Sequence, residues 1–315
     1  MRVLVTGGAG YIGSHAARAL KKAGFEVVIY DNLSTGHRSN ARGFELCTGD
    51  ISDRYTLMSV LSDVDAVMHF AASAYVGESV TNPRKYFDNN AIAAMTLLNA
   101  VTDSGIKKFV FSSSCAVYGV PLASEQPITE ECPRIPVNPY GASKLFFENA
   151  LEAYSTAYGS RSVSLRYFNA AGADESGELQ EKHDPETHLI PLAFAAARTG
   201  PRLHVYGDDY PTLDGTCIRD YVHVNDIADA HVRALQYLEI GGETSAMNIG
   251  SGRATSVFEI IRAVAEHTHR TVRSTIVPRR KGDPPQLIAS YAKARTILSW
   301  TPKRNLKDII RTAAV

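Results

Sequence analysis

Tyr140 and Lys144 stand four residues apart in the sequence Tyr-Gly-Ala-Ser-Lys. The segment has a helical pattern, and on a helix residues i and i+4 share one face, so the phenol and the ammonium can meet over one site. A free phenol has a pKa near ~10 and is a poor base at neutral pH, but a cation held within several ångströms favours the phenolate and lowers that pKa. The pair is therefore a candidate general base that removes a proton from an alcohol.

A glycine-rich loop near the start of the chain is the second candidate for chemistry. Gly7, Gly10 and Gly13 follow an apolar segment directly and open a helical pattern. Glycine permits a tight turn and a close approach of the backbone to a pyrophosphate, and the helix N-terminus offers amide hydrogens to the phosphates. Asp31 ends the next apolar segment, where an acid accepts hydrogen bonds from the adenosine ribose and repels a 2′-phosphate. The loop therefore predicts a binding site for NAD rather than NADP.

Strand-like and helix-like segments alternate through the first half of the chain. Strands are predicted at residues 2–6, 26–30, 66–70, 108–112 and 163–168, and helices at 13–23, 90–104 and 140–158. Strands that alternate with helices form parallel βαβ units, and strands that are apolar along their whole length fit a sheet covered on both faces. The predicted fold is α/β, a Rossmann-type doubly wound parallel sheet.

The alternation changes after about residue 169. Residues 170–188 are rich in Gly, Asp, Glu and His and are predicted to form a long loop, and shorter strands and helices follow. We expect a Rossmann domain over residues 1–169 and a smaller mixed α/β substrate-binding lobe over residues 170–315. Parts of residues 215–250 are expected to return to the first domain.

Composition excludes several classes of protein. The 33 Lys and Arg residues balance 33 Asp and Glu residues, so no global field attracts nucleic acid or an anionic membrane. No apolar run approaches the ~20 residues of a membrane span, and the start lacks the pattern of a signal peptide. The four cysteines are widely spaced, which argues against a disulfide framework and fits a reducing cytoplasm.

Further motifs accompany the loop and the Tyr140/Lys144 pair. They are Asp31-Asn32, His69-Phe70-Ala71-Ala72 with Val76-Gly77-Glu78-Ser79, Ser112-Ser113-Ser114 with Val117-Tyr118-Gly119, Arg166-Tyr167-Phe168-Asn169, Tyr210-Pro211-Thr212 with Asp214-Gly215-Thr216, Arg219-Asp220-Tyr221-Val222-His223-Val224, and Pro278-Arg279-Arg280 with Gly282-Asp283. Together they resemble the extended short-chain dehydrogenase/reductase superfamily and, within it, the UDP-glucose 4-epimerase family. The resemblance covers nearly the whole chain.

The resemblance implies a role for each matching residue. Tyr140 would be the base, Lys144 would tune its pKa and contact the nicotinamide ribose, and Ser114 would relay a proton at the sugar 4-hydroxyl. NAD would be lined by Gly7, Gly10, Tyr11, Ile12, Gly13, Asp31, Asn32, Asp50, Ile51, Phe70, Ala71, Ala72, Asn89, Tyr140, Lys144 and Phe168. The UDP-sugar would be held by Ser114, Asn169, His188, Leu189, Tyr206, Arg219, Arg280, Asp283 and Leu287.

The function implied is reversible C4 epimerisation of UDP-glucose and UDP-galactose through a 4-keto sugar, with tightly bound NAD. The alternative that the chain is a 4-epimerase of another UDP-sugar, either an N-acetylated sugar or a pentose, stays open. A 4,6-dehydratase is disfavoured, because such enzymes place an acidic pair after the serine, and here Ser114 is followed by Cys115 and Ala116. A non-catalytic NAD-binding scaffold is disfavoured because the Tyr140/Lys144 pair is intact. The resemblance also implies a homodimer built by pairing helices.

Two positions depart from the family pattern. His188 stands where asparagine is frequent, and Leu287 stands where tyrosine or cysteine is frequent, near the hexose 2-substituent. Leu287 is intermediate in bulk and so neither admits nor excludes an N-acetyl group. His183, with Asp184, Glu186 and His188, was weighed as a metal site, but we expect this loop to contact substrate or solvent and expect no metal.

Overall fold

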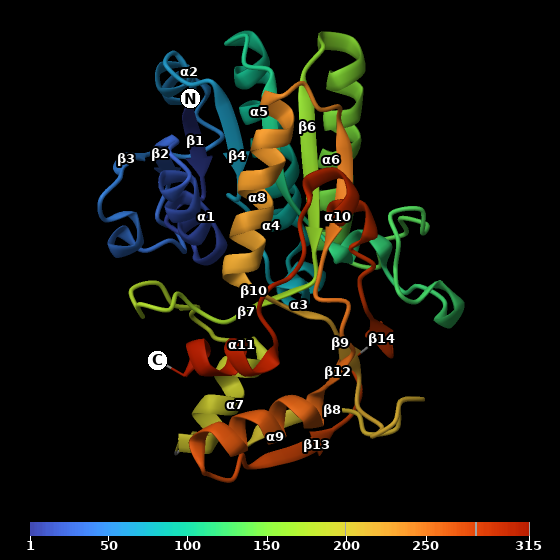
Figure 1. Ribbon diagram of the computed structural model, residues 1–315. Helices are drawn as coiled ribbons and strands as arrows, with labels where there is room; N and C mark the ends of the chain where they lie inside the picture. The colour runs from blue at the N-terminus through green and yellow to red at the C-terminus, as the bar shows by residue number, and fades with distance from the viewer. Residues whose placement is uncertain (199, 281, 315) are drawn as a thin grey trace.

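The computed structural model of the chain describes residues 1–315 except 199, 281 and 315. Seven parallel strands form one sheet in the order β11-β6-β5-β4-β1-β2-β3 (Figure 1). The chain winds outward from β1 in both directions, which is the topology of a doubly wound sheet. The strands are β1 (Arg2–Thr6), β2 (Glu26–Asp31), β3 (Glu45–Thr48), β4 (Ala66–His69), β5 (Lys108–Ser114), β6 (Arg161–Tyr167) and β11 (Ser245–Ile249).

Helices cover both faces of the sheet, because successive side chains of a strand point to opposite faces. Val3 and Val5 of β1 join the core that contains α1, α8 and α10, whereas Leu4 joins the core that contains α2, α5 and α6. These helices are α1 (Tyr11–Lys22), α2 (Arg54–Leu61), α5 (Ala94–Asp103), α6 (Pro139–Tyr158), α8 (Val224–Glu239) and α10 (Ala292–Leu298). Short connecting helices are η1 (Arg38–Ala41), α3 (Val76–Thr81), α4 (Pro83–Phe87), η2 (Asp88–Ala93), η3 (Cys115–Tyr118) and η4 (Ala123–Glu125).

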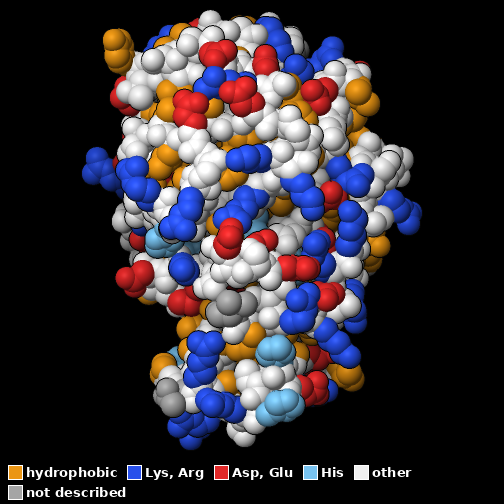
Figure 2. Space-filling view, turned by 60° about the vertical axis from the view of Figure 1, so that its left-hand side comes forward, with side chains coloured by type: hydrophobic (Ala, Val, Ile, Leu, Met, Phe, Trp, Pro, Cys, Tyr) orange, Lys and Arg blue, Asp and Glu red, His pale blue; other side chains and the backbone are white. Residues whose placement is uncertain are grey.

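A smaller lobe lies beyond the carboxyl ends of the strands, at the bottom of Figure 1 and of Figure 2. Its helices share a separate apolar core. They are α7 (Leu189–Arg198), α9 (Val257–Thr268) and α11 (Leu306–Ala313). Its strands pair as β7 (Asn169–Ala171) with β10 (Tyr221–His223), β8 (Leu203–Tyr206) with β13 (Ser274–Val277), and β9 (Ile218–Arg219) with both β12 (Thr255–Ser256) and β14 (Gln286–Leu287).

The predicted fold class is confirmed. The helix expected over residues 90–104 is α5, and it is preceded by a π-helical turn, η2, that begins at Asp88. Residues 224–249 form α8, which shares a core with α1, and β11, which pairs with β6 as a strand of the main sheet.

The surface carries both signs of charge. Figure 2 shows basic side chains interspersed with acidic ones over the visible face, in keeping with the balanced composition. Within the described residues, none of the helices combines the length and the apolar character that crossing a membrane requires.

Candidate active site

The start of α6 fixes the position of Tyr140. Asn138 caps the helix, and its side-chain oxygen accepts a hydrogen bond from the amide of Gly141 at 2.8 Å. Pro139 occupies the first helical position, where its missing N–H costs nothing. The sequence Asn-Pro therefore begins the helix one residue before Tyr140, and Lys144 follows one turn later on the same face.

A glycine lets this helix start approach β5. A Cβ added to Gly141 would lie 2.4 Å from the carbonyl oxygen of Ala116, so only glycine fits where α6 meets η3. Ser114 ends β5 and caps η3, and its hydroxyl accepts the amide of Ala116 at 3.2 Å. The close packing brings the phenol of Tyr140 next to the hydroxyl of Ser114, whose influence favours the phenolate.

Lys144 is buried against the same strand. Its Nζ donates to the carbonyl oxygen of Ser112 at 2.8 Å and lies 4.9 Å from the ring centroid of Phe111. The same Nζ is 5.8 Å from the ring centroid of Tyr140. The structure thus brings Ser114, Tyr140 and Lys144 together at the carboxyl end of β5.

The pKa of Tyr140 moves opposite to the sequence prediction. Burial raises it to about 12, and the hydrogen bond from Ser114 only partly offsets that effect. Lys144 exerts little counter-effect because burial also lowers its own pKa, to about 7, against the opposing influence of Glu148. Sequence spacing showed that the two groups share a face, but it gave no measure of how little water reaches them.

The glycine-rich loop forms a close backbone crossing. Gly7 has φ +72°, and a Cβ there would lie 2.4 Å from the amide nitrogen of Ala71. A Cβ on Gly13 would lie 2.2 Å from the carbonyl oxygen of Gly7. Helix α1 begins directly after Gly10, and no side chain caps its N-terminus. Its first amides are therefore available to a phosphate.

Asp31 stands at the end of β2 and faces this loop. Its carboxylate accepts the amide of Ala9 at 2.9 Å and the amide of Leu33 at 2.8 Å. Next to it, Asn32 donates to the Asp50 carboxylate at 2.7 Å. The two acids thus stand at the carboxyl ends of the neighbouring strands β2 and β3.

The other residues predicted to line NAD occupy strand ends and the adjoining helices. Phe70 follows β4 and packs on His231, with ring centroids 4.6 Å apart. Phe168 is buried just after β6. Asn89 lies in η2, and its side-chain amide donates to the side-chain oxygen of Asn90. The remaining ones are Tyr11 and Ile12 in the first turn of α1, Ile51 buried after β3, and Ala71 and Ala72 after β4.

Three residues predicted to hold the substrate meet in the lobe. Arg219 of β9 forms an ion pair with Asp283, and its Cα is in register with that of Leu287 on β14. Arg219 is largely buried, so its charge is shielded from bulk solvent. Cys217 and Tyr221 adjoin the same guanidinium.

Arg280 and Tyr206 form a second contact in the lobe. The guanidinium carbon lies 3.9 Å from the ring centroid, which is a stacked cation–π geometry. Within the described residues Arg280 forms no ion pair, unlike its neighbour Arg279, whose Nε binds Asp209 at 2.6 Å. Arg280 is therefore held in place while its charge stays available to an anion. Asn169 lies on β7, and its backbone N–H donates to the carbonyl oxygen of Asp220.

His188 lies away from the arginines, among acids of its own loop. Its Nδ1 is 2.8 Å from Glu186 Oε1 and 3.0 Å from Glu181 Oε1, and these carboxylates raise its pKa to about 10 against the effect of burial. Leu189 begins α7 directly after it. His188 thus contacts Glu186, which the sequence analysis had grouped with it, and Glu181, which the sequence analysis had not considered.

Sequence reasoning also missed two residues around the Tyr140/Lys144 face. Glu148 follows Lys144 by four residues on α6 and opposes the lowering of the Lys144 pKa. Tyr167 of β6 shares a hydrogen bond with the hydroxyl of Ser112, whose carbonyl binds Lys144. Glu148 continues the i, i+4 series and could have been found from that spacing, whereas Tyr167 depends on the pairing of β5 with β6.

Comparison with protein families gives one match over most of the chain. The family described as "NAD dependent epimerase/dehydratase family" matches residues 3–250. This range runs from β1 to the end of β11 and contains the glycine-rich loop, Ser114, Tyr140 and Lys144.

Similar proteins align over almost their whole length. A UDP-glucose 4-epimerase of Lacticaseibacillus casei is 50% identical over 321 residues, which cover 99% of this chain and 96% of the relative. A crystal structure of UDP-glucose 4-epimerase from Brucella ovis in complex with NAD is 51% identical, with TM-score 0.96 and coverage of 99% and 97%. A UDP-glucose 4-epimerase from Bifidobacterium longum in complex with NAD+ and UDP is 37% identical, with TM-score 0.93 and coverage of 100% and 97%.

Proposed function

We propose that this chain, which belongs to the NAD dependent epimerase/dehydratase family, interconverts UDP-glucose and UDP-galactose by inverting C4 of the sugar. The observation that carries the proposal is the meeting of Ser114, Tyr140 and Lys144 at the end of β5. This triad lies at the same edge of the sheet as the glycine-rich loop. Ligands of open α/β sheets bind at this edge.

The residues around the loop fit NAD. The uncapped N-terminus of α1 suits the pyrophosphate, and the absence of a Cβ at Gly7 and Gly13 lets the loop pack tightly against the residues after β4 and against the start of that helix. Asp31 suits the hydroxyls of the adenosine ribose. NAD, when bound, supplies the acceptor for the C4 hydride and a positively charged ring whose field lowers the pKa of a neighbouring phenol.

Tyr140 moves the proton. Its phenolate takes the proton of the sugar 4-hydroxyl as the 4-keto sugar forms, and the neighbouring Ser114 hydroxyl would orient the sugar hydroxyl. Burial raises the pKa of Tyr140 to about 12 in the chain without cofactor, so the phenolate would form under the field of bound NAD, and the phenol would return its proton when hydride goes back to C4. Lys144, fixed by the carbonyl of Ser112, keeps the surroundings of the phenol rigid.

The lobe holds the nucleotide end of the substrate. A pyrophosphate pairs with guanidinium groups in two-point geometry, and Arg219 and Arg280 supply two of them. Asp283, paired with Arg219, is placed to accept hydroxyls of the uridine ribose. A firm hold on the UDP leaves the sugar free to turn and present either face of C4.

A direct test uses the purified chain without added cofactor. UDP-galactose is supplied, UDP-glucose is followed, and the denatured protein is extracted for NAD. Conversion with about one NAD per chain is expected. If no UDP-glucose forms and the extract contains no NAD, the proposed function is wrong.

The preferred sugar is tested at Leu287. Leu287 packs against the apolar cluster that contains Phe168, and its partner on β9 is Arg219. Parallel assays with UDP-glucose, UDP-N-acetylglucosamine and UDP-xylose rank the substrates. We expect the Leu287→Tyr variant to lose activity on the N-acetylated sugar first, because added bulk there narrows the pocket. If the variant ranks the three substrates as the wild type does, Leu287 does not line the sugar pocket.

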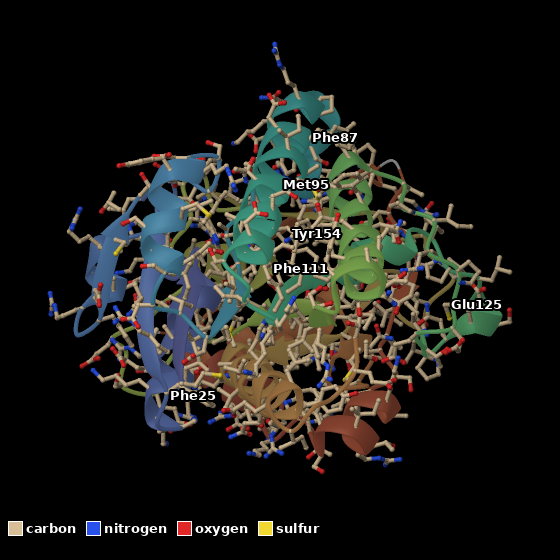
Figure 3. All side chains as sticks on the ribbon, turned by 90° about the horizontal axis from the view of Figure 1, so that it is seen from above. Phe25, Phe87, Met95, Phe111, Glu125 and Tyr154 are labelled. Atoms are coloured by element: carbon tan, nitrogen blue, oxygen red, sulfur yellow. The ribbon has the colours of Figure 1, made fainter. Side chains whose placement is uncertain are left out.

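We infer that the active protein is a homodimer. Exposed apolar side chains gather on α3, α4, η2 and α6, where Val80 is 64%, Phe87 41%, Ile92 64% and Phe146 48% exposed. Figure 3 labels Phe87, Met95 and Tyr154 along the layer of these helices. Exposed apolar side chains on helices that pack against one another fit a second copy of the same surface.

Light scattering tests the dimer. Phe87→Glu combined with Ile92→Glu is expected to halve the mass in solution, because two charges cannot be buried in an apolar interface. Leu213→Glu, on a fully exposed residue of the lobe, is the matched control. A wild-type mass of one chain would reject the dimer.

A further inference from the structure

Four side chains converge in the loop between β7 and α7. Glu181, His183, Glu186 and His188 each offer one nitrogen or carboxylate oxygen, and these atoms all lie within 4.8 Å of one another. Imidazole nitrogens and carboxylate oxygens are the donors that zinc binds in proteins. The spacing Glu-x-His-x-x-Glu-x-His brings all four from a single short segment.

Four nitrogen–oxygen separations in this cluster lie near those around a tetrahedral ion, and the four ligand atoms lie within 4.8 Å of one another. His188 Nδ1 lies 2.8 Å from Glu186 Oε1 and 3.0 Å from Glu181 Oε1. His183 Nδ1 lies 3.4 Å from Glu181 Oε1 and 3.7 Å from Glu186 Oε2. Ligand atoms bound at ~2.0–2.1 Å around a tetrahedral zinc ion are about 3.3 Å apart, and the four separations bracket that value.

The burial of these side chains argues against a cluster held together by ion pairs alone. The Glu181 side chain is 9% exposed, and among the described residues its carboxylate contacts only the two histidines. His183 Nδ1 is also buried and takes part in no hydrogen bond, although it is aimed at the two carboxylates. A buried carboxylate and a buried nitrogen both require a partner. A single cation between them satisfies all four side chains at once.

Contrary to the expectation from the sequence that this loop holds no metal, we propose that Glu181, His183, Glu186 and His188 bind one divalent transition-metal ion, zinc by this ligand set. The ion would fix residues 181–188 in place next to the glycine-rich loop. Tyr11 meets the His183 ring edge-on at 6.2 Å, and its hydroxyl donates to the carbonyl of Gly172 at 2.5 Å. His188 is 43% exposed and opens the cluster to solvent, which gives the ion a path in.

Zinc titration of the full chain tests the site. The protein is stripped with EDTA, dialysed and titrated with ZnCl₂ in a calorimeter at pH 7. We expect one ion per chain, protons released as the ion takes the histidine nitrogens, and slower protease cleavage within residues 172–188. If the wild-type chain binds no zinc, or binds it without protecting the loop, the proposal is wrong.

Matched variants locate the binding. His183→Ala and Glu181→Gln are expected to weaken zinc binding by more than the ~10–100-fold that loss of an outer partner costs. Asp184→Asn in the same loop and His204→Ala on β8, both exposed, should leave it unchanged. Equal affinity in all four variants would place the zinc elsewhere.

Cobalt provides a measurement that needs no variant. Co²⁺ is added to the stripped wild-type chain, and the visible spectrum is recorded. Intense tetrahedral bands are expected from two nitrogen and two oxygen ligands. The weak spectrum of an octahedral ion would overturn the four-ligand site.

Discussion

Arg166 Nη2 lies 2.6 Å from Glu148 Oε2, and the two side chains are 2% and 1% exposed. Glu148 also accepts the hydroxyl of Ser113, and Arg166 donates to the hydroxyl of Tyr118 at 2.8 Å. The pair ties α6, one turn beyond Lys144, to β6 and to the end of β5. It therefore supports the face of α6 that carries Tyr140 and Lys144.

Glu148→Gln should destabilise the fold. Removing one partner leaves the Arg166 guanidinium buried without its counter-charge, which costs about 3–5 kcal/mol. The free energy of unfolding is measured by urea denaturation. Glu152→Gln is the matched control, because Glu152 is exposed on the same helix, and its loss should change stability by less than about 0.5 kcal/mol. Equal losses of stability in both variants would show that the buried ion pair contributes no more to stability than an exposed one.

Lys144→Met should stabilise the NAD-free protein at low pH while abolishing activity. Burial lowers the Lys144 pKa to about 7, so the unfolded chain binds more protons between pH 7 and ~10.4, and the stability of the wild-type protein rises with pH over that range. At pH 6 the charge is buried in full, and the Met variant should exceed the wild type by a few kcal/mol.

Unfolding curves of the wild type and the Met variant at pH 6, 8 and 10 check this prediction. The difference in stability should shrink as pH rises and the folded-state lysine becomes neutral. A difference that stays constant over that range would mean that Lys144 is not held at a lowered pKa.

Tyr140→Phe should lose at least ~10²-fold in turnover, because the variant lacks the hydroxyl that exchanges the proton beside Ser114. Tyr158→Phe, at the exposed end of α6, is the control with the same chemical change. Initial rates with UDP-galactose give the comparison, and circular dichroism confirms folding. Near-normal turnover of the Tyr140 variant would refute its role as the base.

Arg280→Ala should lower kcat/KM for the UDP-sugar by ~10–100-fold, mainly by raising KM, because a charge-assisted hydrogen bond is worth ~1.5–3 kcal/mol. Arg279→Ala removes the adjacent guanidinium, which Asp209 already neutralises, and should cost less than about 3-fold. Steady-state kinetics with both variants decide the matter. Similar losses in the two would argue against a specific phosphate contact at Arg280.

Local patterns predicted much of the fold and the centre of the site. The strand over residues 2–6 and the helix beginning at Asn138-Pro139 were readable because their signals lie within a few neighbouring residues. The motifs also identified the family correctly, since many of them had to match at once.

Features that depend on burial, or on pairing between distant segments, could not be predicted from the sequence. The direction of the Tyr140 pKa shift follows from the exclusion of water by several elements. The two-residue strands β9, β12 and β14 are defined by their pairing, since β9 pairs with both of the others. The grouping of Glu181 with His188 likewise needed the folded loop, since seven residues separate them in the sequence.

The position of β11 has a consequence for synthesis in the cell. β6 is complete at Tyr167, but its outer neighbour β11 ends at Ile249. While the ribosome makes the intervening residues, one edge of β6 presents unpaired backbone groups to any strand nearby. The nascent chain is therefore most exposed to mispairing during this interval, and slowing translation there should increase its dependence on chaperones.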